Sequence, residues 1–394
     1  KYVSLDLKGP TGVEIKRRLL FDTISRYGDL YAELLNHNEV SSFLLIYREG
    51  QVPSSVYRYV NHKYKGRFHI LSLEQFLGIQ LPRNTRGSVI SKATYDWRSD
   101  RDRTMEHAKV SIAENNFSLF LGAGVSMSAN LPCWWNLLVG MINRCKQGMF
   151  KEADLDQLTK VCCNSSIVMC RFIRMMMESK SNEEEFYQCL HEALYNGVDS
   201  FSSPLITEIC HLIQSKRQQA QGIITYNFDD VMERALKSCG IGNYSIFGQN
   251  QPQQLFPIYH VHGFVPFENK ENIKSLPVLS EEEYHRVYAN SYNWSNVEQI
   301  HALSRTTCIF IGLSMTDPNL RRLLDIANKD SEADPRHFVF LPYIDSFGND
   351  KAAEVKNNEA MRIQKEMFEE LGLRVVWYKG HNDELPKFIK ALQG

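Results

Sequence analysis

The sequence predicts an α/β protein in which a doubly wound parallel sheet carries a helical insertion and follows a small α/β N-terminal domain. From about residue 105 onward, apolar runs of strand length alternate with segments of helical periodicity. Most of these runs lack the alternation of a half-exposed strand, which is typical of parallel strands covered on both faces. The chain of 394 residues is also longer than one ordinary hydrophobic core organises, so a second domain is expected.

The first region, residues 1–99, is expected to form the N-terminal α/β domain. The stretch YVSLDLKG predicts a strand, a helical period runs from Val13 to Leu35, and VSSFLLIYREG predicts another strand. FHILSLEQFLGI then predicts a further strand and helix. The polar run from Lys92 to His107 is rich in charge and poor in aliphatic residues, so we interpret it as a linker that leads into a helix.

The second region, residues 105–394, is expected to hold the main sheet, which the pattern predicts to be Rossmann-like. A helical insertion at about residues 134–220 places Leu, Met and Cys at helical spacings. The strands that the apolar runs predict are Ser118–Leu121, Gly222–Tyr226, Phe256–Val261, Thr307–Gly312, His337–Pro342 and Leu373–Tyr378.

Composition narrows the classes of function. The formal net charge is −1, so no global basic field indicates nucleic-acid binding, although a local patch stays open. No apolar run approaches the roughly 20 residues that span a bilayer, and the first residues lack the shape of a signal peptide. Nine irregularly spaced cysteines without any C-x-x-C pair favour a reducing compartment, by default the cytoplasm, and predict no tetracysteine zinc module.

The first candidate site follows the strand at residues 118–121. Gly122-Ala123-Gly124 leads into a helix through Ser126, and such a turn aims backbone N–H groups at an anion. The dinucleotide fingerprint G-x-G-x-x-G requires Gly at position 127, where this chain has Met127. No acidic residue closes a second strand about 20 residues later, so hydride transfer is excluded, whereas a phosphate loop and an ordinary turn both stay open.

The second candidate site is the stretch after the strand at residues 222–226. Thr225, Asn227 and Asp229 lie at the carboxyl end of this strand, where open α/β sheets bind ligands. An acidic residue here, Asp230 above all, also serves as an ordinary helix N-cap. Asn227 is harder to dismiss than these acidic residues, because it lies at the carboxyl end of the strand.

The third and fourth candidate sites end two more strands. His260 and His262 share one face of a strand, and His262 beside Gly263 suits a general base, with a structural histidine as the alternative. A metal site on this pair lacks a third ligand at convincing spacing, so no metal is predicted. Gly312, Ser314 and Asp317 end the next strand, where Asp317 also suits an N-cap.

Taken in order, the four stretches resemble the sirtuin-like superfamily, whose motifs are G-A-G-x-S, T-x-N-x-D, H-G and G-x-S. The resemblance covers about residues 105–394. It implies that NAD is bound and that Asn227, His262 and Asp229 are catalytic. The residues that it implies in NAD binding are Gly122, Ala123, Gly124, Ser126, Thr225, Gly312, Ser314 and Asp317.

The departures from the deacylase pattern point to one branch of that superfamily. The zinc module of the deacylases is absent, T-Y-N-F-D replaces T-Q-N-I-D, and Leu131-Pro132-Cys133 stands where P-D-F-R is expected. In these features the chain is similar to bacterial antiphage members, which hydrolyse NAD as their substrate and need no zinc. An NAD-dependent protein deacylase, an ADP-ribosyltransferase and a catalytically idle NAD or ADP-ribose sensor are the alternatives.

An NAD-depleting effector must be silent in a healthy cell, so the resemblance implies a gate. The expected partners are further copies of the chain, or an activating protein such as an ATPase or a phage-derived trigger. In the N-terminal region, Asp6-x-Lys8 is similar to half of a restriction-endonuclease-like motif. The upstream Asp that such a nuclease also requires would precede Lys1. Because D-x-K at the edge of a strand occurs often by chance, a degenerate or interaction domain is favoured over an active nuclease.

Overall fold

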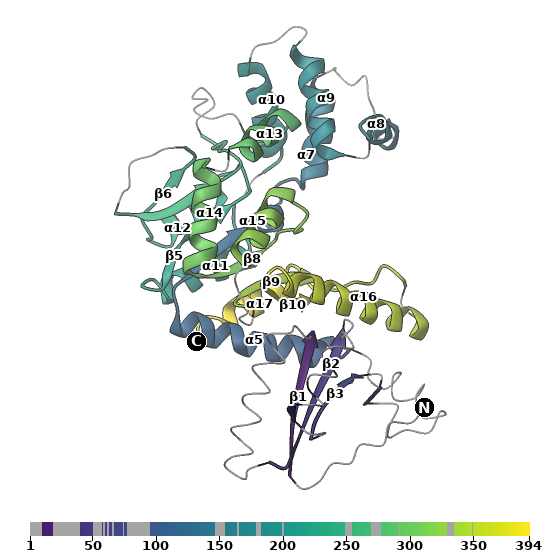
Figure 1. The fold of residues 1–394 in the computed structure, drawn as a ribbon. Helices are drawn as coiled ribbons and strands as arrows, with labels where there is room; N and C mark the ends of the chain where they lie inside the picture. The colour runs from purple at the N-terminus through teal and green to yellow at the C-terminus, as the bar shows by residue number, and fades with distance from the viewer. Residues whose placement is uncertain are drawn as a thin grey trace. The chain divides into compact units, whose positions relative to one another are not determined.

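The computed structural model divides the chain into two compact units, Lys1–Thr94 and Tyr95–Gly394, and each is described by itself (Figure 1). The residues that the structure describes are 10–18, 40–49, 57, 60, 63–64, 67–73, 75–76, 95–145, 154–163, 165–178, 183–198, 201–248, 254–268, 277–290, 292–328, 335–348 and 350–394.

The first unit contains a parallel sheet with the order β1 (Thr11–Arg18), β2 (Ser42–Glu49) and β3 (Phe68–Ser72). The central strand β2 is buried on both faces, because its side chains contribute alternately to two separate apolar clusters. The structure therefore places a small α/β-type sheet at the N-terminal side of the chain.

The helix predicted from Val13 to Leu35 is wrong over residues 13–18, which form β1. Val13 and Ile15 are β-branched residues two positions apart, and a pleated edge strand suits them better than a helix does. The side chains of Val13 and Ile15 are 55% and 67% exposed. Apolar residues at every second position here therefore do not mark a buried face of the strand. The predicted first strand, with Asp6 and Lys8, lies outside the described residues.

The second unit is built on a sheet with the strand order β10-β9-β8-β4-β5-β7-β6, in which every described pairing is parallel. Its strands are β4 (Phe117–Leu121), β5 (Ala220–Thr225), β6 (Asn243–Ile246), β7 (Phe256–His260), β8 (Thr307–Ile311), β9 (His337–Pro342) and β10 (Leu373–Tyr378). The predicted doubly wound sheet is confirmed, and only β6 was missed. β6 is a short polar edge strand with one buried residue, so it lacks the apolar run that identified the others.

Helices cover both faces of this sheet (Figure 1). The described helices of the second unit are α5 (Trp97–Glu114), α6 (Ala123–Met127), α7 (Trp134–Cys145), α8 (Leu155–Val161), α9 (Ser166–Glu178), α10 (Glu183–Tyr195), α11 (Pro204–Ser215), α12 (Val231–Ser238), α13 (Glu281–Ala289), α14 (Trp294–Arg305), α15 (Pro318–Asn328), α16 (Lys351–Glu369) and α17 (Glu384–Ala391). None of the helices in the described ranges is long and apolar enough to cross a membrane.

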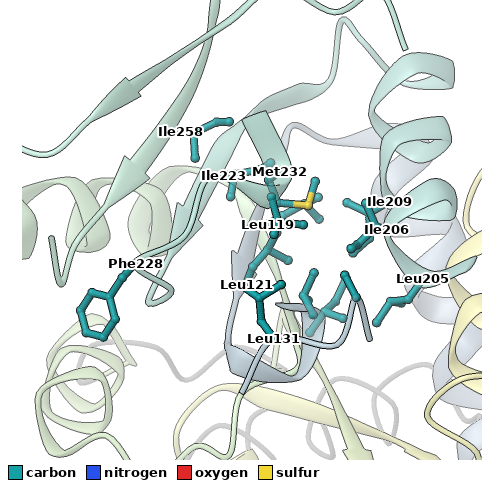
Figure 2. Packing of buried hydrophobic residues seen from close by; sticks show 14 of the residues in the cluster. Leu119, Leu121, Leu131, Leu205, Ile206, Ile209, Ile223, Phe228, Met232 and Ile258 are labelled. Carbon is teal, nitrogen blue, oxygen red and sulfur yellow. The ribbon is translucent and has the colours of Figure 1, made fainter. Parts of the chain in front are cut away.

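The core has two layers, one on each face of the sheet, because successive strand residues point to opposite sides. In β4, Leu119 and Leu121 join the cluster formed with α11, α12 and α17, whereas Phe120 joins the cluster formed with α14, α15 and α16. Figure 2 shows part of the first cluster, with side chains from β4, β5, α11 and α12 gathered together: Leu119, Leu121, Ile223, Ile206, Ile209 and Met232.

The chain between β4 and β5 forms the helices α6 to α11. Figure 1 shows α7, α8, α9 and α10 grouped beside α13, away from the sheet. The last of the series, α11, starts at Pro204 in the first turn, and the Ser203 side chain caps it by accepting the N–H of Ile206.

The strand order places a switch point at β4. From β4 the chain first builds the β5–β7–β6 side of the sheet and afterwards the β8–β9–β10 side. Ligands of open α/β sheets bind outside the carboxyl ends of the strands at such a point. The residues after β4, β5, β7 and β8 therefore form the candidate site.

Candidate active site

The loops after β4 and β8 pack backbone against backbone. Gly122 N–H donates to Ile311 O at 3.0 Å, and Gly124 N–H donates to Gly312 O at 2.9 Å. A Cβ on Gly122 would lie 2.6 Å from Gly312 O, and a Cβ on Gly124 would lie 2.7 Å from Gly312 Cα. The glycines are therefore required for this close approach, and two of the loop N–H groups are bonded within the protein.

Asn227 is buried at the centre of the candidate site. Its Nδ2 group donates to Gly122 O at 3.0 Å and to Ser126 Oγ at 2.8 Å. Its backbone N–H donates to Thr225 Oγ1 at 3.0 Å. Because both amide hydrogens are used, the carbonyl Oδ1 is the group that Asn227 can offer to a bound molecule.

Ser126 connects Asn227 with Asp229. Since its oxygen accepts from Asn227, its single hydroxyl proton is available for the hydrogen bond to the Asp229 carboxylate. Asp229 also accepts the Val231 N–H at 3.2 Å. Burial raises the pKa of Asp229 to about 6, although these two hydrogen bonds favour the charged form. Asp229 is thus a buried carboxyl group that titrates near neutral pH.

His260 holds the backbone of Asn227. Its Nδ1 lies 3.0 Å from Asn227 O, and its Nε2 lies 2.6 Å from Glu233 Oε1. Both partners are acceptors, so both ring nitrogens carry a proton. Burial alone would lower the pKa of His260, but the Glu233 carboxylate outweighs it and the pKa is raised. His260 is therefore a structural, charged histidine.

The pKa of His262 is shifted in the opposite direction to that of His260. Burial lowers its pKa, and the Asp317 carboxylate, 3.5 Å from Nε2, offsets this only in part. The distance between Nε2 and the carboxylate is too long for a good hydrogen bond. We therefore treat His262 as a neutral imidazole beside a carboxylate. The rings of Tyr226 and Tyr284 meet the imidazole edge-on, with centroids at 4.7 and 5.6 Å. A buried, neutral His262 can accept a proton.

Asp317 lies at the start of α15 and has two other partners. Its Oδ1 accepts the Leu320 N–H at 2.7 Å, as the predicted N-cap does, and its Oδ2 accepts Tyr284 Oη at 2.7 Å. Its predicted role in NAD binding stays a prediction. Its observed contacts lead to the catalytic candidate His262.

The other predicted residues are also located. Ala123 opens α6, and Thr225 is buried at the end of β5. Ser314 is exposed, and its Oγ lies 2.7 Å from Thr316 Oγ1. Gly312 has a left-handed backbone, with φ at +70°. The structure thus brings the four motif stretches to one edge of the sheet.

Sequence reasoning missed three residues that support this edge: Glu233, Tyr284 and His381. His381 follows β10, and its Nε2 lies 2.7 Å from Gly124 O. None of the three belongs to a recognisable motif, so only the folded chain reveals them. In the described ranges no group of three His, Cys, Asp or Glu side chains gathers as a metal site.

A family model described as a SIR2-like domain matches residues 221–366. The chain is 26% identical over 239 residues to "NAD(+) hydrolase ThsA" of Bacillus cereus (strain MSX-D12), which covers 58% of this chain and 44% of that protein. It is 24% identical over 226 residues to "NAD(+) hydrolase ThsA" of Enterococcus faecium, at 57% and 42% coverage. A solved Sir2 enzyme shares 14% identity at a TM-score of 0.36, over 74% of this chain and 98% of that one.

The family match contains three of the four motif stretches, whereas the Gly122–Ser126 loop precedes it. The chain spans less than half the length of the curated relatives that it matches. The sirtuin-like resemblance predicted from the sequence is confirmed, and the relatives are named as hydrolases of NAD.

Proposed function

We propose that this chain, whose residues 221–366 match a SIR2-like domain, hydrolyses NAD to nicotinamide and ADP-ribose. The observation that carries the proposal is that Asn227 and His262 are both buried and follow the neighbouring strands β5 and β7 at the same edge of the sheet. Asn227 can offer its Oδ1 as an acceptor, because both hydrogens of its Nδ2 are donated within the protein, and His262 is a buried base with a lowered pKa. The NAD hydrolases among the relatives support this choice of substrate.

In the proposed reaction, water replaces nicotinamide at the anomeric carbon of the ribose. The glycosidic C–N bond breaks, nicotinamide leaves as a neutral molecule, and a C–O bond to water forms. His262 takes the proton that the water loses, and Asn227 Oδ1 accepts a hydrogen bond from the water or from a ribose hydroxyl. Asp229, when ionised, stabilises the positive charge that develops on the sugar.

The phosphates of NAD are assigned to the loop at Gly122–Ser126, and the adenosine side is assigned to Ser314. Because the N–H groups of Gly122 and Gly124 are bonded to the last residue of β8 and to Gly312 after it, the loop would have to bind through its other donors and the start of α6. The wider role that we propose is that of a gated effector of antiphage defence. Its activation would depend on further copies of the chain or on a protein partner.

The test is to incubate the purified chain with NAD and to separate the products by chromatography. We expect free nicotinamide and ADP-ribose without any acceptor peptide. His262→Ala should lower the rate by roughly 10²–10⁴-fold, as the loss of a general base does. Asn227→Ala should lower it by roughly 10²–10³-fold, because a preorganised hydrogen bond to the reacting groups is lost. His301→Ala, an exposed histidine on α14, is the matched control and should keep the rate.

Other products would replace the proposal with one of its alternatives. Acetyl transfer from a peptide to ADP-ribose would identify a deacylase, and ADP-ribose bound to protein would identify a transferase. Tight NAD binding without any turnover would indicate either a sensor or a closed gate that lacks its activator. Unchanged NAD loss in a folded His262→Ala variant would refute the assignment of the base.

A further inference from the structure

One oxygen atom of Asp317 is shared between two side chains. Tyr284 Oη donates to Oδ2 at 2.7 Å, while His262 Nε2 lies 3.5 Å from the same oxygen. The other oxygen, Oδ1, accepts the Leu320 N–H at 2.7 Å. Tyr284 thus makes the short hydrogen bond to Oδ2, and His262 is left with the longer contact.

In this arrangement, Tyr284 and His262 compete for a hydrogen bond to Asp317 Oδ2. A carboxylate oxygen that accepts a good hydrogen bond is less available to a second donor, because part of its charge is already compensated. If the Tyr284 hydroxyl were withdrawn, His262 Nε2, which lies 3.5 Å from Oδ2, would be placed to donate to that oxygen when it carries a proton. The stronger contact would orient the imidazole and raise its basicity.

Tyr284 belongs to α13, and α13 is tied to the helical insertion. Arg171 of α9 lies 3.1 Å from Glu281 and 3.0 Å from Glu282, both in the first turn of α13. Arg174 of α9 forms an ion pair with the buried Glu283. We call these contacts the α9–α13 clasp, and Tyr284 is the residue that follows Glu283.

We propose that Tyr284 is a positioning residue through which the helical insertion controls His262. In the state described by the structure, the α9–α13 clasp holds Tyr284 against Asp317 and keeps Asp317 at 3.5 Å from the base. A partner that moves α9 would withdraw Tyr284, and Asp317 would then bond to His262. The proposal rests on the proposed function for its catalytic meaning, but the contact itself can be tested without NAD.

The titratable groups that face His262 come from three elements. Tyr226 follows β5, Tyr284 comes from α13, and Asp317 precedes α15. Burial raises the pKa of both tyrosines, and Asp317 raises it further, so both stay neutral at physiological pH. The Asp317 carboxylate is therefore the charged group that raises the pKa of His262 against the effect of burial.

The first experiment measures the pKa of His262 by NMR titration of the full, histidine-labelled chain. The His262 signal is assigned from its loss in His262→Gln. Asp317→Asn should lower the pKa by about 1 to 3 units, because an opposite charge within reach of the ring is removed. Tyr284→Phe should raise it by about half a unit or more, because Asp317 becomes free for His262.

The matched control is Tyr288→Phe, which also removes a tyrosine hydroxyl group, but from a residue one turn further along α13. The Tyr288 ring contacts Arg322, and Asp317 reaches this residue only through its charge, so Tyr288→Phe should shift the His262 pKa less than Tyr284→Phe does. A Tyr284→Phe variant with an unchanged or lowered His262 pKa would overturn the proposal. So would a Tyr288→Phe variant that shifts the pKa as much as Tyr284→Phe does.

The second experiment tests the link to the insertion. Arg171→Gln combined with Arg174→Gln should raise the His262 pKa in the same direction as Tyr284→Phe, and combining all three should add no further shift. If the double variant does not fold, Arg171→Gln alone is the substitute, because that side chain is 49% exposed. If the His262 pKa shifts of the double variant and of Tyr284→Phe were additive, or if the double variant shifted the pKa not at all, the proposed connection between the α9–α13 clasp and His262 would be overturned.

The two proposals fail in distinguishable ways. The NMR shifts are measured without NAD, so they stand or fall independently of turnover. If NAD is hydrolysed, the acidic limb of the kcat/KM profile should move with the NMR pKa in each variant. NMR shifts without a matching movement of the limb would retain the coupling but would refute His262 as the base.

Discussion

Gly312→Ala should be one of the most damaging single-methyl substitutions in the site. Gly312 has φ at +70°, and an added Cβ would lie 2.7 Å from Val125 N and 3.0 Å from Gly124 Cα. Both neighbours are backbone, so neither can rotate away. The substitution therefore combines a strained backbone with overpacking between the loops after β4 and β8.

The matched control separates these two costs. Gly240 has a similar φ of +76°, but no atom of the described residues lies within 4 Å of its Cβ position. A left-handed conformation costs an L-residue about 1–2 kcal/mol, and this cost applies to both sites. Overpacking adds about 1–3 kcal/mol, and it applies at Gly312 alone. The two variants should therefore differ by about 1–3 kcal/mol in the free energy of unfolding.

The assay is urea unfolding followed by tryptophan fluorescence. All five tryptophans lie in the second unit, Tyr95–Gly394, so the signal reports on the unit that holds both glycines. We expect a lower midpoint for Gly312→Ala than for Gly240→Ala, at similar m-values. Equal midpoints would show that the two loops can separate freely, which would refute the close packing described for the site.

The remaining predictions concern two buried groups whose pKa values are shifted. Cys308 N–H donates to His337 Nδ1, and burial together with Arg336 lowers the His337 pKa to about 3. The unfolded chain then binds a proton below pH about 6.5 that the folded chain does not bind, so stability is lost as the pH falls. At about 1.4 kcal/mol per unit, His337→Asn should reduce the loss between pH 7 and 5 by about 2 kcal/mol, and an unchanged loss in urea titrations would contradict this. Asp229 has a raised pKa of about 6, so its contribution to stability is lost as the pH rises through that value. Asp229→Asn should raise the unfolding free energy at pH 7 by up to about 3 kcal/mol while slowing NAD turnover, and a less stable variant would contradict this.

Much of the main sheet could be predicted because buried parallel strands have a direct signature in sequence. Five consecutive buried residues, as in β4 and β8, leave continuous apolar runs. Where the signature fails, so does the prediction. The residues of β6 are mostly polar, and β1 exposes Val13 and Ile15, so neither strand had a pattern that matched its burial.

The meeting of the four motif stretches could also be predicted, since the carboxyl ends of parallel strands share one edge. Which of His260 and His262 is the general base and which is structural could not be decided from the sequence, where both roles stayed open. The sequence predicted both on one strand, but β7 ends at His260 and His262 follows it. The partners that distinguish them are Glu233 of α12 and Asp317, which lies in the loop before α15. Partners distant in sequence leave no local pattern, which is also why Tyr284 was missed.

The charges at this edge suit a substrate with a positively charged nicotinamide ring. His260 and Glu233 compensate each other as an ion pair, so the pair adds no net repulsion. His262 has a lowered pKa and is neutral at pH 7, whereas Asp229 is largely ionised above a pKa of about 6. The catalytic candidates therefore present one net negative charge to the cation, which favours its binding. Acidification would neutralise Asp229 and add a positive charge to His262, and both changes would weaken the binding of a cation.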